Sequence, residues 1–464
     1  SDKTTGKKRP KGHQKGTPPP PKRLYNELET RDEVWDLSEE NKICSTCGKP
    51  LYEIANTDDT EILEIEVKGY KRKIRRKKYA KKCLCTSGKQ EIIMAPAPPK
   101  LPNKSRIGIS IWVCILMRKY HFQIPVARVL KNLSLNGLDL AKGTVGDGLK
   151  KIAPLFKPVY SALEERSRQS DWWQADETRW NVFEQTKSKT SYRWYLWVFI
   201  SAESVVHIID PTRSARVIEE HLGRVIDGIL LVDRYSAYKS FAKKKDGILL
   251  AFCWSHARRD ILDAKKKYPL LKDWADKWEE KANLLFHQNN LRVQYPAGSR
   301  QFTREDALLK ESLSSFENDF REELKTPHLH HEQKKVLNSL QNHWNGLTVF
   351  ADHPHIPMDN NGSERTLRNS ALGRKNYYGS QTVWSGEFTA IMLSIFETLE
   401  LWKINQQQWL TDYLNACAAG CGNPPEDIKP FLPWHMKKDA EPTRTYCGRR
   451  LSKADIQCIK DILD

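Results

Sequence analysis

Residues 171–256 alternate between strand-like and helix-like segments, a pattern typical of an α/β domain. Three runs rich in β-branched and aromatic residues come first, at 171–183, 193–200 and 204–210. A helix-like run at 213–223, a strand-like run at 228–233, a second helix-like run at 235–245 and a strand-like run at 247–254 follow. We expect the first three strands to form a meander and the last two to be separated by helices.

The next segments complete this domain. Residues 257–357 carry Leu and Trp at helical spacing with mixed charge, which predicts an all-helical insertion whose apolar stripes are mostly core. Residues 358–420 predict a helix that begins after the capping residues 359–363, followed by a polar loop and a long amphipathic helix. Residues 421–464 form a Pro-rich C-terminal tail. The order of elements in 171–256, three strands, helix, strand, helix and strand, resembles the ribonuclease-H-like fold of polynucleotidyl transferases.

Three acidic residues lie at informative points of this pattern. Asp176 is in the first predicted strand, Asp233 ends the strand GILLVD, and Glu364 is in the helix after the insertion. Asp233 follows Asp176 by 57 residues and Glu364 follows Asp233 by 131 residues, and the insertion explains the longer interval. A lone acid is usually a solvated charge or a cap, but a carboxylate beside a sheet core is costly to bury without a partner.

A pair of divalent metal ions would supply such a partner. Carboxylates on adjacent strands repel each other, and bound Mg²⁺ keeps them ionised. Mg²⁺ prefers oxygen ligands and retained water. Two such ions, for which Mn²⁺ can substitute, activate an attacking oxygen and stabilise the leaving oxygen of a phosphodiester. We therefore predict that Asp176, Asp233 and Glu364 are catalytic residues and Mg²⁺ ligands.

The charge of the chain points to a polyanionic partner. Its 464 residues carry a formal net charge of +18, and nine of the twelve residues from Lys71 to Lys82 are Lys or Arg. Nucleic acid is the first candidate, and a merely basic soluble protein is the alternative. Residues 1–40 read as a basic disordered tail that is either a linker or a phosphate contact. No apolar run is long enough to span a bilayer, and no signal peptide is visible, so we expect a cytoplasmic, nucleoid-associated protein.

Residues 41–95 predict a small zinc-binding ribbon. Cys44 and Cys47 have the spacing of a metal knuckle, and residues 61–80 alternate like a two-stranded ribbon. Cys83 and Cys85 complete a set of four thiolates for Zn²⁺. The alternative is that these four are free structural cysteines.

Residues 103–170 predict a helical module. Its apolar spacing gives one helix and then a helix, turn and helix, with Pro125 in the first turn of one helix and the break at Asn136-Gly137. One interpretation is a DNA-reading helix-turn-helix, and the other is a helical hairpin that packs on its neighbours.

Several residues near the three acids are candidates for DNA contacts. The cations could hold phosphates or be ordinary surface charge, Trp254 could stack on an unpaired base or fill core space, and His256 could contact the scissile phosphate or be structural. The full set is Arg234, Lys239, Trp254, His256, Arg258, Arg259, Arg365 and Arg368.

Five motifs together resemble insertion-sequence transposases of the IS sixty-six type. They are ADETRW, LLVDRYSAYK, CWSHARR, DNNGSERTLR and LPWH, and the resemblance runs from about residue 5 to about residue 435. It implies a DDE transposase that uses Mg²⁺ to cleave at the ends of its mobile element and join them to target DNA. The triad maps on Asp176, Asp233 and Glu364. Cys253 and His256 resemble the C-x-x-H element of several DDE groups, and the N-terminal cysteines resemble the family's zinc-binding domain.

We therefore expect a multidomain transposase that binds transposon ends and target DNA and works as a homo-oligomer, with accessory proteins of the same element as possible partners. Two alternatives remain at this stage. One is a catalytically silent DNA-binding regulator derived from a transposase, and the other is a structure-selective nuclease of the same fold.

Overall fold

The structure is a computed structural model. It describes residues 105–186 and 191–436 without a gap, and earlier parts at 29–30, 32–34, 36–42, 45–46, 48–51, 63, 67–80, 92–95 and 97–101. The chain divides into two compact units, 1–66 and 67–464. The boundary between them falls inside the predicted 41–95 unit. In the first unit, η1 (Glu39–Lys42) is a single 3-10 turn whose Lys42 pairs with Asp36 and Glu39.

The basic segment that opens the second unit is mostly irregular. The antiparallel strands β1 (Lys78–Ala80) and β2 (Ile92–Met94) are short, and residues 67–77 contain no strand. The ribbon predicted within 61–80 is therefore wrong over 67–77. The alternation there has no apolar face to bury, because most of these residues are Lys or Arg, and like charges on neighbouring strands repel.

The helical module is confirmed within 105–170. Its elements are α1 (Ile109–Leu116), η2 (Met117–His121, a π-helical turn), α2 (Val126–Leu135), α3 (Lys142–Ile152), η3 (Ala153–Phe156) and α4 (Lys157–Arg168). Pro125 caps α2, and Asn136 ends it before Gly137, whose φ is +77°. The module shares one hydrophobic core with α13 (Val383–Leu401) and α14 (Gln406–Ala419), from the other end of the chain.

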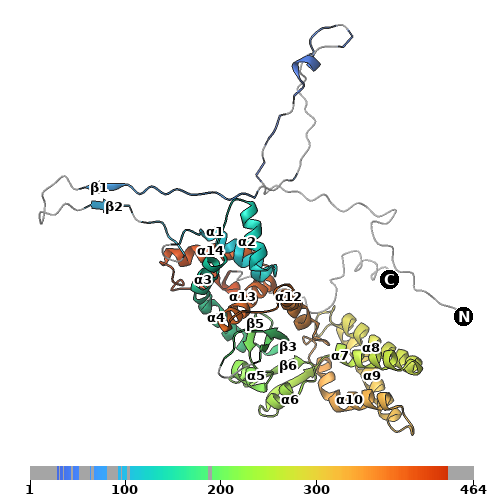
Figure 1. The fold of residues 1–464 in the computed structure, drawn as a ribbon. Coiled ribbons are helices and arrows are strands. Elements are labelled where there is room, and N and C mark those ends of the chain that lie inside the picture. Colours follow the sequence, from blue (N-terminus) through green and yellow to red (C-terminus); the bar gives the residue numbers. More distant parts are fainter. Residues whose placement is uncertain are drawn as a thin grey trace. The chain divides into compact units, whose positions relative to one another are not determined.

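A five-stranded mixed sheet forms the centre of the second unit (Figure 1). Every predicted strand of the 171–256 segment is present, as β3 (Trp172–Asn181), β4 (Arg193–Ile200), β5 (Val205–Asp210), β6 (Asp227–Val232) and β7 (Gly247–Phe252). Their order is β5-β4-β3-β6-β7, with β3, β4 and β5 antiparallel and β3, β6 and β7 parallel. The helices α5 (Ala215–Leu222) and α6 (Ser236–Ala242) connect the parallel strands. This arrangement is consistent with the expected ribonuclease-H-like core.

Side chains alternate between the two faces of the sheet. On β3, Trp173 and Ala175 join the core that includes α5 and α6, while Gln174 faces α12 (Asn361–Tyr377), where its side-chain oxygen accepts a hydrogen bond from the Ser363 backbone N–H at 3.2 Å. α13 packs on β5, and its Thr398 hydroxyl accepts from the Val205 N–H at 3.0 Å. The sheet is therefore covered on both faces.

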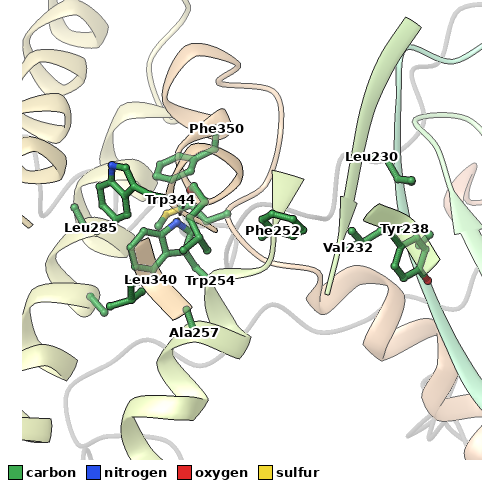
Figure 2. Packing of buried hydrophobic residues seen from close by; sticks show 14 of the residues in the cluster. Leu230, Val232, Tyr238, Phe252, Trp254, Ala257, Leu285, Leu340, Trp344 and Phe350 are labelled. Atoms are coloured by element: carbon green, nitrogen blue, oxygen red, sulfur yellow. Dashed lines mark hydrogen bonds between the residues drawn. The ribbon is translucent and has the colours of Figure 1, made fainter. Parts of the chain in front are cut away.

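The insertion predicted at 257–357 is helical. It comprises α7 (Trp254–Lys267), η4 (Pro269–Leu271), α8 (Lys272–Arg292), α9 (Arg300–Glu323), α10 (His331–Leu347) and α11 (Val349–Asp352). Its core is continuous with that of the sheet, and Figure 2 shows members of the cluster from Leu230 and Val232 on β6 to Trp254 and Trp344 in the helices. The last elements that the structure describes are η5 (Lys429–Phe431) and α15 (Pro433–Met436).

The insertion is closed at its base. The Trp254 N–H at its start donates to the Met358 carbonyl at its end, at 2.9 Å, and the Asn360 N–H donates to the Cys253 sulfur at 3.2 Å. Farther out, the fully buried Arg292 guanidinium donates to Asp306 and to the Phe350 and Ala351 carbonyls, which ties α8 to α9 and α11. The chain thus returns to the sheet beside the point where it left.

Two glycines of α3 provide a test of the packing in the helical module. A Cβ at Gly148 would lie 2.1 Å from the ring of the buried Trp112, so Gly148→Ala should lower the free energy of unfolding by about 1–3 kcal/mol. Gly146 has open space around it, so Gly146→Ala should raise that free energy by up to about 1 kcal/mol through helix propensity. Urea unfolding of both variants checks this. Equal changes in both would contradict the packing.

Candidate active site

Asp176 lies in the middle of β3, opposite Val198 of β4. It is on the same face of the sheet as Gln174, two residues earlier, which contacts α12. Its Oδ1 accepts a hydrogen bond from the Glu177 backbone N–H at 2.8 Å. The side chain is half-buried on this strand because the sheet and α12 enclose it.

Asp233 follows β6 directly, where the strand gives way to the turn before α6. Its Oδ1 accepts from the Tyr235 N–H at 2.8 Å, which holds the carboxylate at the start of that turn. β3 and β6 are parallel, with Gln174 paired to Leu231. Continuing this register by two residues sets Asp176 beside Asp233, so the pairing of the two strands brings the two acids together.

Glu364 lies in the first turn of α12. Two contacts fix the start of this helix against the sheet: the Ser363 N–H donates to Gln174, and the Asn360 side-chain amide donates to the Ala175 carbonyl at 2.8 Å. Both partners are neighbours of Asp176 on β3. The helix therefore delivers its carboxylate to the edge of the sheet where the other two acids lie.

The pKa of Asp176 reflects its buried position and the negative charges around it. Burial raises the pKa of the Asp176 carboxyl to about 7, with further increases from the negative charges of Glu177, Asp233 and Glu364. No salt bridge to Asp176 or Asp233 occurs among the residues that the structure describes. Glu364, in contrast, lies 3.8 Å from His256 Nε2 and 3.7 Å from an Arg259 nitrogen.

These residues fit a divalent cation in donor chemistry and charge. Their donors are carboxylate oxygens, and neither Asp176 nor Asp233 forms a salt bridge in the described part of the chain, although Arg213 and Lys239 lie within electrostatic range of Asp233. A bound cation would lower the pKa of Asp176 and favour its ionised form. In the described residues, however, no three His, Cys, Asp or Glu side chains lie close enough together to hold a metal as they stand. Side-chain rearrangement would have to accompany metal binding.

Cys253 and His256 flank this site on α7. Cys253 precedes the helix, is buried, and accepts from the Asn360 N–H, and burial raises the pKa of its thiol to about 11. It is thus a structural contact between α7 and the start of α12. His256 faces Glu364. Burial lowers the pKa of its imidazole, and the positive charge of the nearby Arg259 lowers it further.

Most of the predicted DNA-contacting cations on α6 and α7 are already paired within the chain. Arg234 donates to Asp260 and to Ser339, each at 2.6 Å, and Lys239 contacts His343 Nε2 at 2.6 Å. Arg258 pairs with Glu279 at 3.0 Å. These contacts join the turn after β6 and α7 to the helical insertion, so these three residues have structural partners beside any role toward DNA.

Arg259, Arg365 and Arg368 are more open. The Arg259 side chain is 53% exposed, and Arg365 and Arg368 lie on the exposed face of α12, one turn apart. Both follow Glu364 on the same helix, so they extend from the three acids along one surface. They are the predicted phosphate contacts that the fold leaves accessible.

The structure excludes one of the two alternatives predicted for Trp254. It is fully buried, its indole N–H donates to the Leu347 carbonyl at 2.6 Å, and its ring packs edge-on against Phe316 and Trp344. Figure 2 shows Trp254 beside Trp344. Stacking on a base is therefore wrong for Trp254. The residue fills core space because it is the first residue of α7 and points into the insertion.

The sequence reasoning did not single out three polar residues of the site. Glu177 neighbours Asp176, Arg213 contacts Glu177, and Asp359 lies near Glu364. Burial raises the pKa of the Asp359 carboxyl, and its oxygens accept from the backbone and side chain of Asn361. Each lies next to a motif residue or to a strand end, and this position in the sequence could have indicated a role at the site. The four predicted zinc ligands, Cys44, Cys47, Cys83 and Cys85, lie outside the described residues.

Comparison with known proteins decides the family. The sequence profile described as "Transposase IS66 family" matches residues 104–388, which is more than half of the chain. The chain belongs to the IS66 transposase family. The match covers the sheet, the insertion and α12, so all three acids lie inside the family's domain.

Three relatives from Sinorhizobium fredii (strain NBRC 101917 / NGR234) are similar to this IS66-family chain over most of its length. "Uncharacterized protein y4jD" is 27% identical, covering 87% of this chain and 80% of the relative. "Uncharacterized protein y4hP" is 23% identical, covering 86% and 74%, and "Uncharacterized protein y4qI" is 24% identical, covering 92% and 79%. Separately, none of the helices in the described part of the chain has the length and apolar composition to cross a membrane.

The raised pKa of Asp176 predicts a stability that falls with pH. The carboxyl has an ordinary pKa of 3.8 when unfolded and about 7 when folded, so the folded state binds the proton more tightly. Stability is then lost as the pH rises from about 4 to about 7. In metal-free buffer, Asp176→Asn should be more stable than the unaltered protein at pH 8 by about 1–3 kcal/mol, and by less at pH 5.

Urea unfolding in EDTA at the two pH values measures this difference. Asp171→Asn, an exposed acid just before β3, is the matched control and should change little at either pH. Equal stability of Asp176→Asn and the unaltered protein at pH 8 would contradict the burial and charge crowding of this carboxyl.

Proposed function

We propose that this chain is a DDE-type DNA transposase that cleaves at the ends of an insertion sequence and joins them to target DNA. The observation that carries this proposal is the parallel pairing of β3 with β6, whose register sets Asp176 beside Asp233, with no salt bridge to either aspartate among the described residues. The negative charge of Glu364 also raises the pKa of Asp176, which supports a shared site. Membership of the IS66 family supports the same reaction.

In this proposal Asp176, Asp233 and Glu364 hold the catalytic Mg²⁺ ions, with Mn²⁺ able to substitute. When bound, the ions activate the attacking oxygen and stabilise the leaving 3′-oxygen. The backbone N–H groups of Glu177 and Tyr235 orient the two aspartates through their hydrogen bonds. His256 and Arg259 lie against Glu364, where they can orient its carboxylate or contact the scissile phosphate.

DNA would approach over the exposed side of α12. Arg365 and Arg368 present guanidinium groups there, and Arg259 is exposed beside them. Guanidinium groups hold phosphate oxygens without reading sequence. The net charge of +18 and the basic segment from Lys71 to Lys82 add attraction over longer range. The helix, turn and helix of α2 and α3 are the candidate for reading the element's ends.

The remaining parts of the proposal follow from the reaction. Two ends must be joined in concert, so the working form is a homo-oligomer, and it acts on DNA in the cytoplasm. Zn²⁺ held by Cys44, Cys47, Cys83 and Cys85 stays a prediction from sequence, which metal analysis of Cys44→Ser checks through the loss of zinc.

Loss of one acid should separate catalysis from binding. Asp233→Asn should reduce cleavage of labelled element ends in Mg²⁺ by at least about a hundredfold, because it removes one of the carboxylates proposed to bind the metal. End binding measured in EDTA should stay within about twofold, since no phosphate contact is assigned to Asp233. Asp227→Asn, an exposed acid at the other end of β6, is the matched control and should cleave normally.

The outcomes separate this proposal from its alternatives. Binding without nicking by the unaltered protein would support a catalytically silent regulator. Nicking without covalent joining to a second DNA in a strand-transfer assay would support a structure-selective nuclease. Retained cleavage by Asp233→Asn would remove Asp233 from the mechanism.

The exposed arginines predict the salt dependence of DNA binding. Affinity should fall steeply with added salt, and Arg365→Ala and Arg368→Ala should each lower the log–log slope by about 1 because one phosphate contact is lost. Arg321→Ala, a half-exposed arginine paired with Glu317 on α9, is the control and should leave the slope unchanged. Fluorescence anisotropy across a salt series measures it. A slope unaffected by either α12 variant would place the DNA elsewhere.

A further inference from the structure

A ring of contacts joins the backbones of Asp176 and Asp233 on the side of the sheet away from α12. It passes through Glu177, Arg213 and Tyr235, and we call these three residues the acid clasp. Arg213 comes from the turn between β5 and α5, far in sequence from both acids. The tertiary structure brings these three residues together, and none of them is a predicted metal ligand.

The first half of the ring fixes β3. Glu177 follows Asp176 and points to the opposite face, where its side chain is only 1% exposed. Its Oε1 accepts a hydrogen bond from Arg213 Nε at 2.6 Å and forms an ion pair with Arg213 Nη2 at 2.5 Å, and its Oε2 accepts from the Tyr238 hydroxyl at 2.5 Å. A buried carboxylate held by two donors and an ion pair has little freedom to move. Its own backbone N–H donates to Asp176 Oδ1, so its position sets that carboxylate.

The second half fixes the turn after β6. The Arg213 guanidinium carbon lies 3.9 Å from the centre of the Tyr235 ring, and the Tyr235 hydroxyl donates to the Arg213 carbonyl at 2.8 Å. This is a cation–π contact closed by a hydrogen bond. The Tyr235 backbone N–H donates to Asp233 Oδ1 at 2.8 Å. The ring therefore runs from Asp176 through the acid clasp to Asp233 without a break.

We propose that the acid clasp is a set of positioning residues that holds Asp176 on β3 and Asp233 after β6 in neighbouring positions, so that less rearrangement is needed when a divalent metal binds. The inference rests on the proposed function, and it concerns residues that touch neither metal nor DNA. Two carboxylates that repel each other need an external restraint to stay close before a cation arrives. Groups that orient ligands from behind commonly change metal affinity by about 10–100-fold when removed.

The clasp predicts weaker metal binding when it is opened. Arg213→Ala and Glu177→Gln should each raise the Mn²⁺ dissociation constant at least about tenfold, read by electron paramagnetic resonance on the full chain without DNA at pH 8. The Mn²⁺ concentration for half-maximal cleavage should rise in parallel, while end binding in EDTA stays unchanged. The double variant should be no weaker than the worse single variant, because both changes open the same ring.

Lys244→Ala is the matched control. Lys244, which follows α6, makes a surface ion pair at 2.6 Å with Glu219 of α5, and it is not part of the clasp. It should leave Mn²⁺ affinity unchanged. Circular dichroism and thermal unfolding identify variants that do not fold, and Tyr235→Phe, which removes only the hydroxyl bond to Arg213, then serves as the milder opening of the ring and should weaken Mn²⁺ binding in the same direction.

Comparison with Asp233→Asn separates the two proposals. If Asp233→Asn loses Mn²⁺ affinity and folded Arg213→Ala, Glu177→Gln and Tyr235→Phe do not, the clasp is overturned and the proposed function stands. If Asp233→Asn binds Mn²⁺ as the unaltered protein does, the metal-ligand assignment fails and the clasp fails with it. Reduced affinity in the clasp variants with normal affinity in Lys244→Ala supports the inference.

Discussion

The parallel pairing of β3 with β6 is the interaction on which the rest of this site depends. It sets the strand that carries Asp176 beside the strand that ends on Asp233, and it does so in a register fixed by backbone hydrogen bonds. The strand order β5-β4-β3-β6-β7 places this pair at the centre of the sheet, covered on both faces. Gln174 and Ala175 on the same strand then receive the start of α12, so one strand positions all three acids.

The helical insertion could have separated the third acid from the other two, but its base is closed. Trp254 and Met358 are joined by a backbone hydrogen bond, and Cys253 and Asn360 by an N–H to sulfur contact. The hydrophobic cluster around Trp254 and Trp344 continues the core of the sheet, so the insertion is held by apolar burial as well. A chain that travels through more than a hundred residues therefore returns within reach of its starting point.

Charge pairing explains which cations the fold leaves accessible. Arg234, Arg258 and Lys239 have partners in or next to the insertion, whereas Arg365 and Arg368 lie on the exposed face of α12. The same reasoning applies to the acids. Glu177 is matched by Arg213 and Tyr238, while Asp176, one residue away on the opposite face, is matched by no cation in the described part of the chain. A strand that alternates its faces can thus hold one paired carboxylate and one without a salt bridge side by side.

Local sequence patterns determined the strands and most of the helices of this protein, and they supplied the three acids as candidates. Runs of apolar and aromatic residues gave β3 to β7, and helical spacing gave most of the helices from α8 to α13, because side-chain periodicity reports which residues are buried. The tertiary structure alone decided that β3 pairs with β6, that Trp254 is core, and that Arg213 reaches Glu177. These contacts join residues far apart in the chain, and their partners depend on strand order and packing, which no local pattern encodes. The ribbon expected within 61–80 was wrong over 67–77 for the converse reason: alternation without an apolar face gives no burial to hold a strand.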